Sequence, residues 1–332
     1  MSKVRFKRLP KSQSIHHSAS VKVTQMNHIV EVVHVAHLSN NLELYTKLNK
    51  DTYAVVDRDT GEVEIMEYSL NENRGQNTAG LKKTLKNISA LINNNFTGAS
   101  DELFITLTYR LTDGKPMNDV KQASKDFDNF IKRLRRKHKG IEYIAVLESQ
   151  ANTAWHWHLL VKFTHWKERQ QFFIDNNTVI EPLWGHGWTK TKAIDNIDNI
   201  GAYLSAYLTD VEINDENSDV LFDTVYKSNN TIVIEEKEIA DERGNIVTKK
   251  FIKGGRMHLY PTGTNIYRCS RGIKKPTPLK MTYAEAKAKI IGDEKPSFSQ
   301  TTVIIGKDGD SDEERIYNSI TYEQYNLKRK KR

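Results

Sequence analysis

The chain has 332 residues, of which 38% are hydrophobic and 28% are charged, and its formal net charge is +8. This balance is typical of a globular protein, and the basic excess favours polyanionic partners, either nucleic acid or an acidic membrane surface. No apolar run of about 18 residues predicts a membrane span, the basic N-terminus lacks the apolar segment of a signal peptide, and the single cysteine, Cys269, excludes an internal disulfide.

The first part of the chain is predicted to be rich in β-structure. Residues 1–20 are basic and expected to be loose. Two β-rich runs cover residues 21–38 and 52–69, and the second contains a hairpin signal at 57–61. Apolar residues recur at helical spacing over 81–96, which predicts an amphipathic helix. The chain contains no P-loop sequence, so we expect no built-in helicase motor.

A buried strand and a long helix are predicted next. Residues 103–109, LFITLTY, are β-branched and aromatic, as in a buried strand. Residues 119–138 carry a single apolar stripe and predict a helix. The helix ends in a basic run, which complements the helix dipole and is also a candidate contact for DNA phosphates. The residues assigned to that contact are Arg133, Arg135 and Arg136.

Two histidines mark the following strand. His156 and His158 flank Trp157, and in a strand the two imidazoles share one face while the indole points into the opposite layer. The preceding segment, residues 141–148, is also strand-like. Small polar residues lie between the two segments, as in a hairpin connection.

A hairpin centred on residue 152 brings a carboxylate to these histidines. It pairs Glu148 with His156 and Val146 with His158, and paired residues share a face. Two imidazoles and one carboxylate, with room for a substrate oxygen, are the ligands of an open catalytic metal site. A slip of one residue would turn Glu148 away, and the histidines would then be packing residues. The set accepts Mn²⁺ or Mg²⁺, and also zinc or nickel.

A second informative stretch is the helix predicted over residues 196–209. Tyr203 and Tyr207 are four residues apart and therefore lie on one helical face. Such a pair is more often a packing feature than a catalytic one, but the candidate metal site upstream raises catalysis as an alternative. A strand is predicted just before the helix, at 189–193. Its candidate DNA contacts are Lys190 and Lys192.

The composition changes after residue 211. An acidic stretch leads into a hairpin predicted over 231–252. A basic segment with interleaved tyrosines follows over 256–275, as in proteins that bind single-stranded nucleic acid, although edge strands with gatekeeping charges look similar. A helix over 281–291 and a charged tail complete the chain. The candidate DNA contacts of the basic segment are Arg268, Arg271 and Lys274.

Three motifs in this order resemble those of the HUH endonucleases. Residues 104–109, FITLTY, are similar to the first motif, His156-Trp157-His158 to the second, and the segment GAYLSAY ending at Tyr207 to the third. Within these enzymes the chain resembles the two-tyrosine rolling-circle replication initiators, the Rep proteins of small plasmids and phages. The resemblance is strongest over residues 99–211.

The resemblance implies a fold and a reaction. The fold is α+β, a ferredoxin-like, split-βαβ domain with a central antiparallel sheet. The reaction is site-specific, metal-dependent nicking and rejoining of single-stranded DNA at an origin hairpin, through a covalent 5′-phosphotyrosine. The implied setting is the cytoplasm of a bacterial host, with a host helicase and DNA polymerase as partners and no membrane.

The resemblance also implies the metal ligands. The family holds a divalent metal, here Mn²⁺ or Mg²⁺, through the two histidines of the second motif, His156 and His158, and often an upstream acid. That acid maps to Glu148. Gln150 is a weaker substitute for it, and His186 is an alternative third imidazole.

Tyr203 is the implied first nucleophile and Tyr207 the second. The third motif usually carries a lysine three residues after its first tyrosine, where this chain has Ala206. Lys190 or Lys192 could supply the missing charge. The alternatives are a weakened nuclease or DNA-binding regulator on the same fold, a relaxase or transposase with the same chemistry, and a zinc hydrolase unrelated to DNA, which would leave the tyrosine pair and the basic surface unexplained.

Four parts of the chain follow from this interpretation. Residues 1–98 form an N-terminal extension, β-rich and then helical, that packs on the nuclease. Residues 99–211 form the HUH endonuclease core. Residues 212–280 contain the hairpin insertion and the basic, DNA-facing segment, and residues 281–332 contain a helix and a charged tail.

Overall fold

A computed structural model of the chain divides it into two compact units, Asn71–Pro276 and a second unit that combines Met1–Leu70 with Thr277–Arg332. We call them the central unit and the terminal unit. The two ends of the chain therefore belong to one unit, whereas the sequence interpretation assigned them to separate parts. The residues that the structure describes are 5–37, 43–49, 52–57, 63–67, 78–149, 154–163, 173–194, 199–201, 211–213, 234–240, 246–252, 260–261, 263–307 and 314–328.

The terminal unit contains a six-stranded antiparallel sheet with strand order β1-β16-β17-β3-β2-β15, and a three-stranded sheet with order β4-β5-β6. The hairpins predicted over 21–38 and 52–69 are present as β2-β3 and β5-β6. The element bounds are β1 Arg5–Arg8, β2 Ser20–Met26, β3 Ile29–Val35, β4 Glu43–Lys47, β5 Thr52–Asp57, β6 Val63–Glu67, β15 Leu279–Thr282, α6 Tyr283–Ala286 with a π-helical turn at Lys287–Ile291, β16 Phe298–Lys307 and β17 Glu314–Asn326.

The C-terminal residues correct the prediction of a charged tail. β16 and β17 form a long hairpin, and β17 also pairs with β3. Val303, Ile305 and Tyr325 are buried in this unit. The charged residues at the start of β17, Glu314 and Arg315, are exposed, so they cost the strand little. The N-terminus is corrected as well, because Arg5–Arg8 is not loose but pairs with β16.

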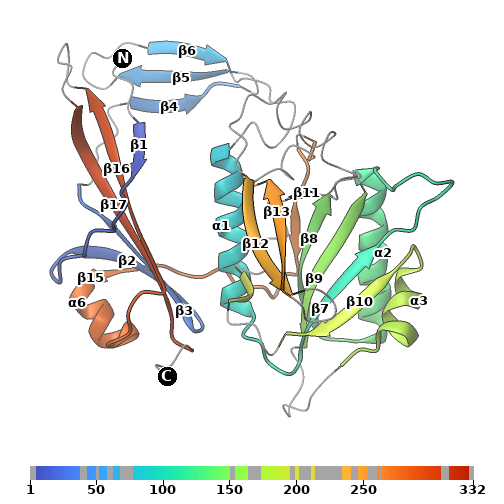
Figure 1. The fold of residues 1–332 in the computed structure, drawn as a ribbon. Coiled ribbons are helices and arrows are strands. Elements are labelled where there is room, and N and C mark those ends of the chain that lie inside the picture. Colours follow the sequence, from blue (N-terminus) through green and yellow to red (C-terminus); the bar gives the residue numbers. More distant parts are fainter. Residues whose placement is uncertain are drawn as a thin grey trace. The chain divides into compact units, whose positions relative to one another are not determined.

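The central unit is built on a five-stranded antiparallel sheet with strand order β10-β7-β9-β8-β14. β9 runs antiparallel to both of its neighbours, so β7 and β8 point the same way on either side of it, and α2 connects them (Figure 1). A separate three-stranded sheet, β11-β13-β12, contains the hairpin predicted over 231–252. The predicted α+β class with antiparallel sheets is confirmed.

The elements of the central unit lie close to their predicted positions. Asp119 caps α2 by accepting hydrogen bonds from the backbone N–H groups of Lys121 and Gln122, at 2.8 and 3.1 Å, which explains why this helix begins there. The bounds are α1 Thr78–Asn95, β7 Glu102–Thr108, α2 Val120–Lys137, β8 Ile141–Ser149, β9 Trp155–Phe163, a π-helical turn at Asn176–Ile180, α3 Glu181–Trp184, β10 Thr189–Ala193, β11 Val211–Ile213, β12 Ile234–Ala240, β13 Ile246–Ile252 and β14 Tyr267–Cys269.

The register of the five-stranded sheet assigns each side chain to one of two faces, because paired residues share a face and neighbours along a strand alternate. We call the face that carries the two histidines the imidazole face, and the opposite one the helix face. The imidazole face carries Phe104, Thr106, Thr108, Ile144, Val146, Glu148, His156, His158, Leu160, Lys162, Lys190, Lys192 and Tyr267.

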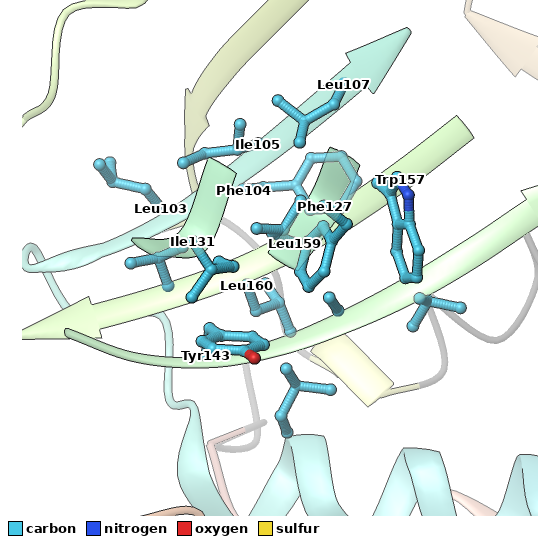
Figure 2. Close-up of a cluster of buried hydrophobic side chains, with 14 of the residues drawn as sticks. Leu103, Phe104, Ile105, Leu107, Phe127, Ile131, Tyr143, Trp157, Leu159 and Leu160 are labelled. Atoms are coloured by element: carbon cyan, nitrogen blue, oxygen red, sulfur yellow. The ribbon is translucent and has the colours of Figure 1, made fainter. Parts of the chain in front are cut away.

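The helix face is an apolar surface closed by α2. Trp157 is fully buried there, as predicted, with its ring stacked on Phe127 at a centroid distance of 4.2 Å. Its indole N–H donates to the carbonyl of Ala123 at 3.2 Å. Figure 2 shows Phe127 and Trp157 close together, with Leu159 from the same strand as Trp157 beside them. This packing anchors β9 and thereby fixes the direction in which its histidines point.

Part of the imidazole face is covered by α1. The Lys162 ammonium donates to the carbonyl of Asn95 at 2.9 Å and lies 5.5 Å from the centre of the Phe96 ring. Ile88 and Ile92 of α1 are fully buried. The two long helices therefore pack on opposite sides of the sheet, as Figure 1 shows.

Candidate functional site

The predicted pairing of β8 with β9 is confirmed. Glu148 lies opposite His156, as the hairpin argument required. On the other side of β9, Thr108 lies opposite His156 and Thr106 lies opposite His158. The imidazole face therefore has a compact polar region in which one carboxylate, two imidazoles and two hydroxyls come from three adjacent strands.

Glu148 and His158 are in direct contact through Glu148 Oε2 and His158 Nε2. The exposed fractions are 4% for Glu148, 6% for His158 and 8% for His156. A carboxylate that is buried to this extent requires hydrogen-bond donors or a positive charge beside it. A proton on His158 or a cation held between these groups meets that requirement.

Hydroxyl groups of β7 lie against the Nδ1 atoms of both histidines. Thr106 Oγ1 is 3.2 Å from His158 Nδ1, and Thr108 Oγ1 is 3.5 Å from His156 Nδ1. Phe104 stacks on the His158 ring, with a centroid distance of 5.5 Å. Histidines that bind metals commonly use one ring nitrogen for the metal while an oxygen atom holds the other. The threonines are suited to that second role.

The donor set fits a divalent metal, with two imidazoles and the Glu148 carboxylate as ligands. The structure joins Glu148 to His158 and places His156 directly across from the carboxylate. Over the described residues, no three His, Cys, Asp or Glu side chains form a complete metal-binding group. The metal site thus remains a prediction that rests on the chemistry and register of these three residues.

Sequence reasoning missed the two threonines. Thr106 and Thr108 are separated by one residue, which is also the spacing of the two histidines. In an antiparallel pair this matched spacing places each hydroxyl beside one imidazole. The signal was therefore present in FITLTY, but it could be read only after β7 was known to pair with β9.

Lys190 and Lys192 lie on the imidazole face, on the edge strand β10. Lys190 is opposite Thr106, and Lys192 is opposite Phe104. Both lysines are exposed. Because neighbouring strands are about 4.8 Å apart, the Lys190 backbone is about 10 Å from that of His158. Both cations are therefore on the correct face to meet an anion that approaches the histidines.

The basic end of α2 packs on the other face of the sheet. Arg133 donates from Nε to the carbonyl of Leu183 at 2.8 Å and from Nη2 to that of Trp184 at 3.5 Å, which anchors α3. Arg135 lies 5.5 Å from the centre of the Tyr143 ring. Arg135 and Arg136 are exposed. The structure does not bring these three arginines to the histidines, and their contact with DNA remains a prediction.

The basic segment near β14 divides in the same way. Arg268 forms an ion pair of 2.5 Å with Asp128 of α2, which assigns it to the helix face. The backbone N–H of Lys274 donates to Asn95 Oδ1 at 2.9 Å, while its side chain is exposed, as is that of Arg271. A structural role explains Arg268 without DNA, and the other two side chains remain candidate DNA contacts.

His186, the alternative third imidazole, does not meet the histidine pair. Its Nε2 is 3.7 Å from Asp126 Oδ1 on α2, and its ring packs against those of Trp184 and Tyr109. Tyr109 donates a hydrogen bond to Asp126 Oδ2 at 3.2 Å. Burial, followed by the nearby Asp126 charge, raises the pKa of Tyr109 well above its usual range. This group stabilises the contact between β7 and α2.

A second buried ion cluster, at the far end of the imidazole face, is also structural. The Glu102 carboxylate accepts hydrogen bonds from three successive backbone N–H groups in the turn after α1, those of residues 97–99. Burial raises the pKa of Glu102 despite these bonds. Lys162, directly across from Glu102, has a pKa lowered by burial. The cluster fixes the connection from α1 to β7.

The described start of the predicted tyrosine helix lies against α1. Ile200 is buried, and the Gly201 N–H donates to Asn93 Oδ1 at 2.9 Å. A β-carbon on Gly201 would lie 2.7 Å from the backbone oxygen of Ser89, so only glycine permits this approach. The segment therefore begins in the helical layer on the imidazole face. Tyr203, Tyr207 and Ala206 lie outside the described residues, as does Gln150.

Comparison with known families supports a replication protein. The model of a family described as replication-associated protein, of the ORF2 type, matches residues 102–212, about a third of the chain. This is the part in which the three motifs were recognised. No curated protein and no solved structure gives a significant match. Among the described residues, no helix has the length and apolar character needed to cross a membrane.

Proposed function

We propose that the chain is a replication initiator that nicks and rejoins single-stranded DNA at an origin through a tyrosine. The observation that carries this proposal is the convergence of Glu148, His156 and His158 on one face of the sheet, within the segment similar to replication-associated proteins. The strand arrangement supports it too, since β7-α2-β8 with β9 between the two parallel strands is the pattern of a split βαβ unit.

The proposed reaction is a phosphoryl transfer in which bonds are exchanged. The Tyr203 oxygen forms a bond to the scissile phosphorus as the bond from phosphorus to the 3′ oxygen breaks. The phenol loses its proton, and the leaving oxygen gains one and becomes a free 3′-OH. The 5′ phosphate stays on the tyrosine until Tyr207 or the 3′-OH attacks it, which closes the cycle.

The residues on the imidazole face divide the work of this reaction. Glu148, His156 and His158 hold a divalent metal, which when bound polarises a non-bridging oxygen of the scissile phosphate. Thr106 and Thr108 orient the imidazoles. Lys190 and Lys192 stabilise the negative charge that develops as the phenol, with an ordinary pKa of about 10, attacks.

The test is the formation of a covalent protein–DNA adduct. Full-length protein is incubated with a labelled single-stranded oligonucleotide from the parent replicon's origin and Mn²⁺ or Mg²⁺, then resolved on a denaturing gel. We expect an adduct that EDTA, His158→Ala and Tyr203→Phe abolish. His186→Ala is the matched control, because its imidazole contacts Asp126 instead, and it should retain the adduct. Loss of the adduct in His186→Ala would overturn the ligand assignment.

A DNA-binding regulator is the second candidate, and Ala206 favours it. This residue replaces the lysine usual in the third motif, which removes a positive charge expected near the nucleophile. A regulator would bind the origin oligonucleotide and form no adduct with any divalent metal. In that outcome, Ala206→Lys should restore cleavage if the missing charge alone is responsible.

A further inference from the structure

The edge strand of the central sheet begins next to an exposed tryptophan. Trp188 has an exposed fraction of 75%, whereas Trp155, Trp157 and Trp184 are at most 3% exposed. A single exposed apolar residue needs no special explanation by itself. The location of Trp188 relative to the polar region is what makes it informative.

Trp188 continues the row of residues that contains His156. Its carbonyl accepts a hydrogen bond from the backbone N–H of Thr108 at 2.8 Å, which extends the β7-β10 pairing by one residue beyond Thr189. The row therefore runs from Trp188 through Thr108 and His156 to Glu148. Because paired residues share a face, the indole belongs to the imidazole face, about 10 Å along the row from His156.

The preceding loop holds Trp188 firmly in this place. A β-carbon on Gly187 would lie 2.4 Å from the backbone oxygen of Thr108 and 2.5 Å from the backbone nitrogen of Arg110, so only glycine allows the two segments to cross. The carbonyl of His186 accepts a hydrogen bond from the Arg110 N–H at 2.9 Å. Two backbone bonds and a close crossing thus pre-organise the exposed indole.

Positive charge continues from the indole along the same strand and face. Lys190 and Lys192 follow at intervals of two residues, about 6.7 Å apart, and both are exposed. An aromatic ring in line with cations is the pattern that binds single-stranded nucleic acid, because bases stack on the ring and phosphates meet the cations.

We propose that Trp188 is a base-stacking platform that holds single-stranded DNA on β10 and directs its backbone toward His156 and His158. The inference rests on the proposed function for its ligand, and it assigns a residue and a path along the sheet edge. The two lysines contact phosphates of the same strand. A nucleotide near the scissile phosphate is thereby held by its base as well as by its charge.

The test measures binding without cleavage. A fluorescein-labelled oligothymidylate of about 20 nucleotides is titrated with full-length protein in EDTA, and the dissociation constant is followed by anisotropy at several salt concentrations. Trp188→Ala should weaken binding about tenfold, within the range of about 5- to 150-fold for the loss of one stacked base. Trp188→Phe should retain most of the affinity.

The salt dependence separates stacking from charge. Trp188→Ala should leave the slope of log Kd against log salt unchanged, whereas Lys190→Ala should reduce it by about 0.7. Phe298→Ala and Lys280→Ala, which remove an exposed ring and an exposed cation of the terminal unit, are the matched controls and should behave as the wild type. A Trp188→Ala protein that binds with wild-type affinity would overturn the proposal.

Failure of the proposed function would look different. If wild-type protein binds the oligonucleotide and Trp188→Ala weakens it, the platform stands even when no adduct forms with a divalent metal. If wild-type protein forms the adduct and Trp188→Ala changes neither binding nor cleavage, only the platform is wrong. If no single-stranded oligonucleotide binds at all, both proposals are wrong, and the exposed indole belongs to a protein–protein contact.

Discussion

The two faces of the five-stranded sheet are built from the same strands but differ in chemistry. On the helix face, Trp157 and Phe127 stack inside an apolar layer sealed by α2. On the imidazole face, Glu148 and His158 place a carboxylate and an imidazole in contact within a buried environment. The first arrangement follows from the hydrophobic effect, whereas the second costs desolvation energy. We interpret this difference as a division of labour: one face stabilises the unit, and the other carries the chemistry.

The largest effect on stability should come from the helix face. Trp157→Ala removes a fully buried ring and its hydrogen bond to Ala123, and we expect the free energy of unfolding to fall by about 3–5 kcal/mol. Urea denaturation of the full chain measures the change. Trp188→Ala is the control and should cost less than about 0.5 kcal/mol, since its ring is exposed. Equal losses in the two variants would contradict the comparison.

The imidazole face should gain stability only with its metal. Mn²⁺ at about 100 times its dissociation constant should stabilise the wild type by about 2.7 kcal/mol, measured as a rise in the thermal midpoint. In Glu148→Gln the rise should be much smaller, because one ligand of the proposed set is lost. Without metal, this variant should be within about 1 kcal/mol of the wild type, since the amide carries no desolvated charge. A midpoint that no divalent metal raises in the wild type would argue against the site.

A glycine connects the proposed chemistry to the packing. Gly201→Ala places a β-carbon 2.7 Å from the Ser89 backbone oxygen on α1, which must shift the start of the segment that carries Tyr203. We expect a loss of about 1–3 kcal/mol in the free energy of unfolding and a larger fractional loss of adduct formation. Gly263→Ala is a weak control for crowding, because nothing lies within 4 Å of its β-carbon position, although its φ of +80° adds strain. A Gly201→Ala protein with unaltered adduct yield would separate this contact from the reaction.

The smallest effect concerns Tyr109 and depends on pH. Its phenol donates to the buried Asp126, and burial raises the pKa of Tyr109 above that of the unfolded chain. Its stabilisation is therefore present below about pH 10 and is lost as the pH rises through the folded-state pKa. Tyr109→Phe should cost about 1 kcal/mol at neutral pH, and this cost should shrink above pH 10. Denaturation at pH 7 and pH 10.5 measures both; a cost that grows with pH would reverse the sign of the argument.

Local patterns in the sequence were sufficient for much of the central unit. The alternation around Trp157 predicted a strand with its histidines on one face, and the small polar residues before it predicted the hairpin that pairs Glu148 with His156. The apolar stripe of residues 119–138 predicted α2, which begins one residue later than expected, after its Asp119 cap. These elements depend on contacts between residues that are close in the chain, so their patterns are local.

Long-range pairing was beyond the reach of such patterns. Nothing local shows that β1 pairs with β16 or that β17 pairs with β3, and therefore the hairpin near the C-terminus was mistaken for a tail. For the same reason, the arginines of α2 were expected near DNA, although their helix packs on the face opposite the histidines. A charge run is visible in a sequence, but the face on which it lies is not.

The sequence by itself thus determined the strands, the residue types of the site and the pairing of Glu148 with His156, because all of these lie within one hairpin. Only the tertiary structure decided which neighbours complete the site. Pairing of β7 with β9 brought Thr106 and Thr108 to the imidazoles, and pairing of β10 with β7 brought Lys190 and the exposed Trp188 to the same face. These contacts join residues separated by dozens of positions, and their register is set by the packing of the whole sheet.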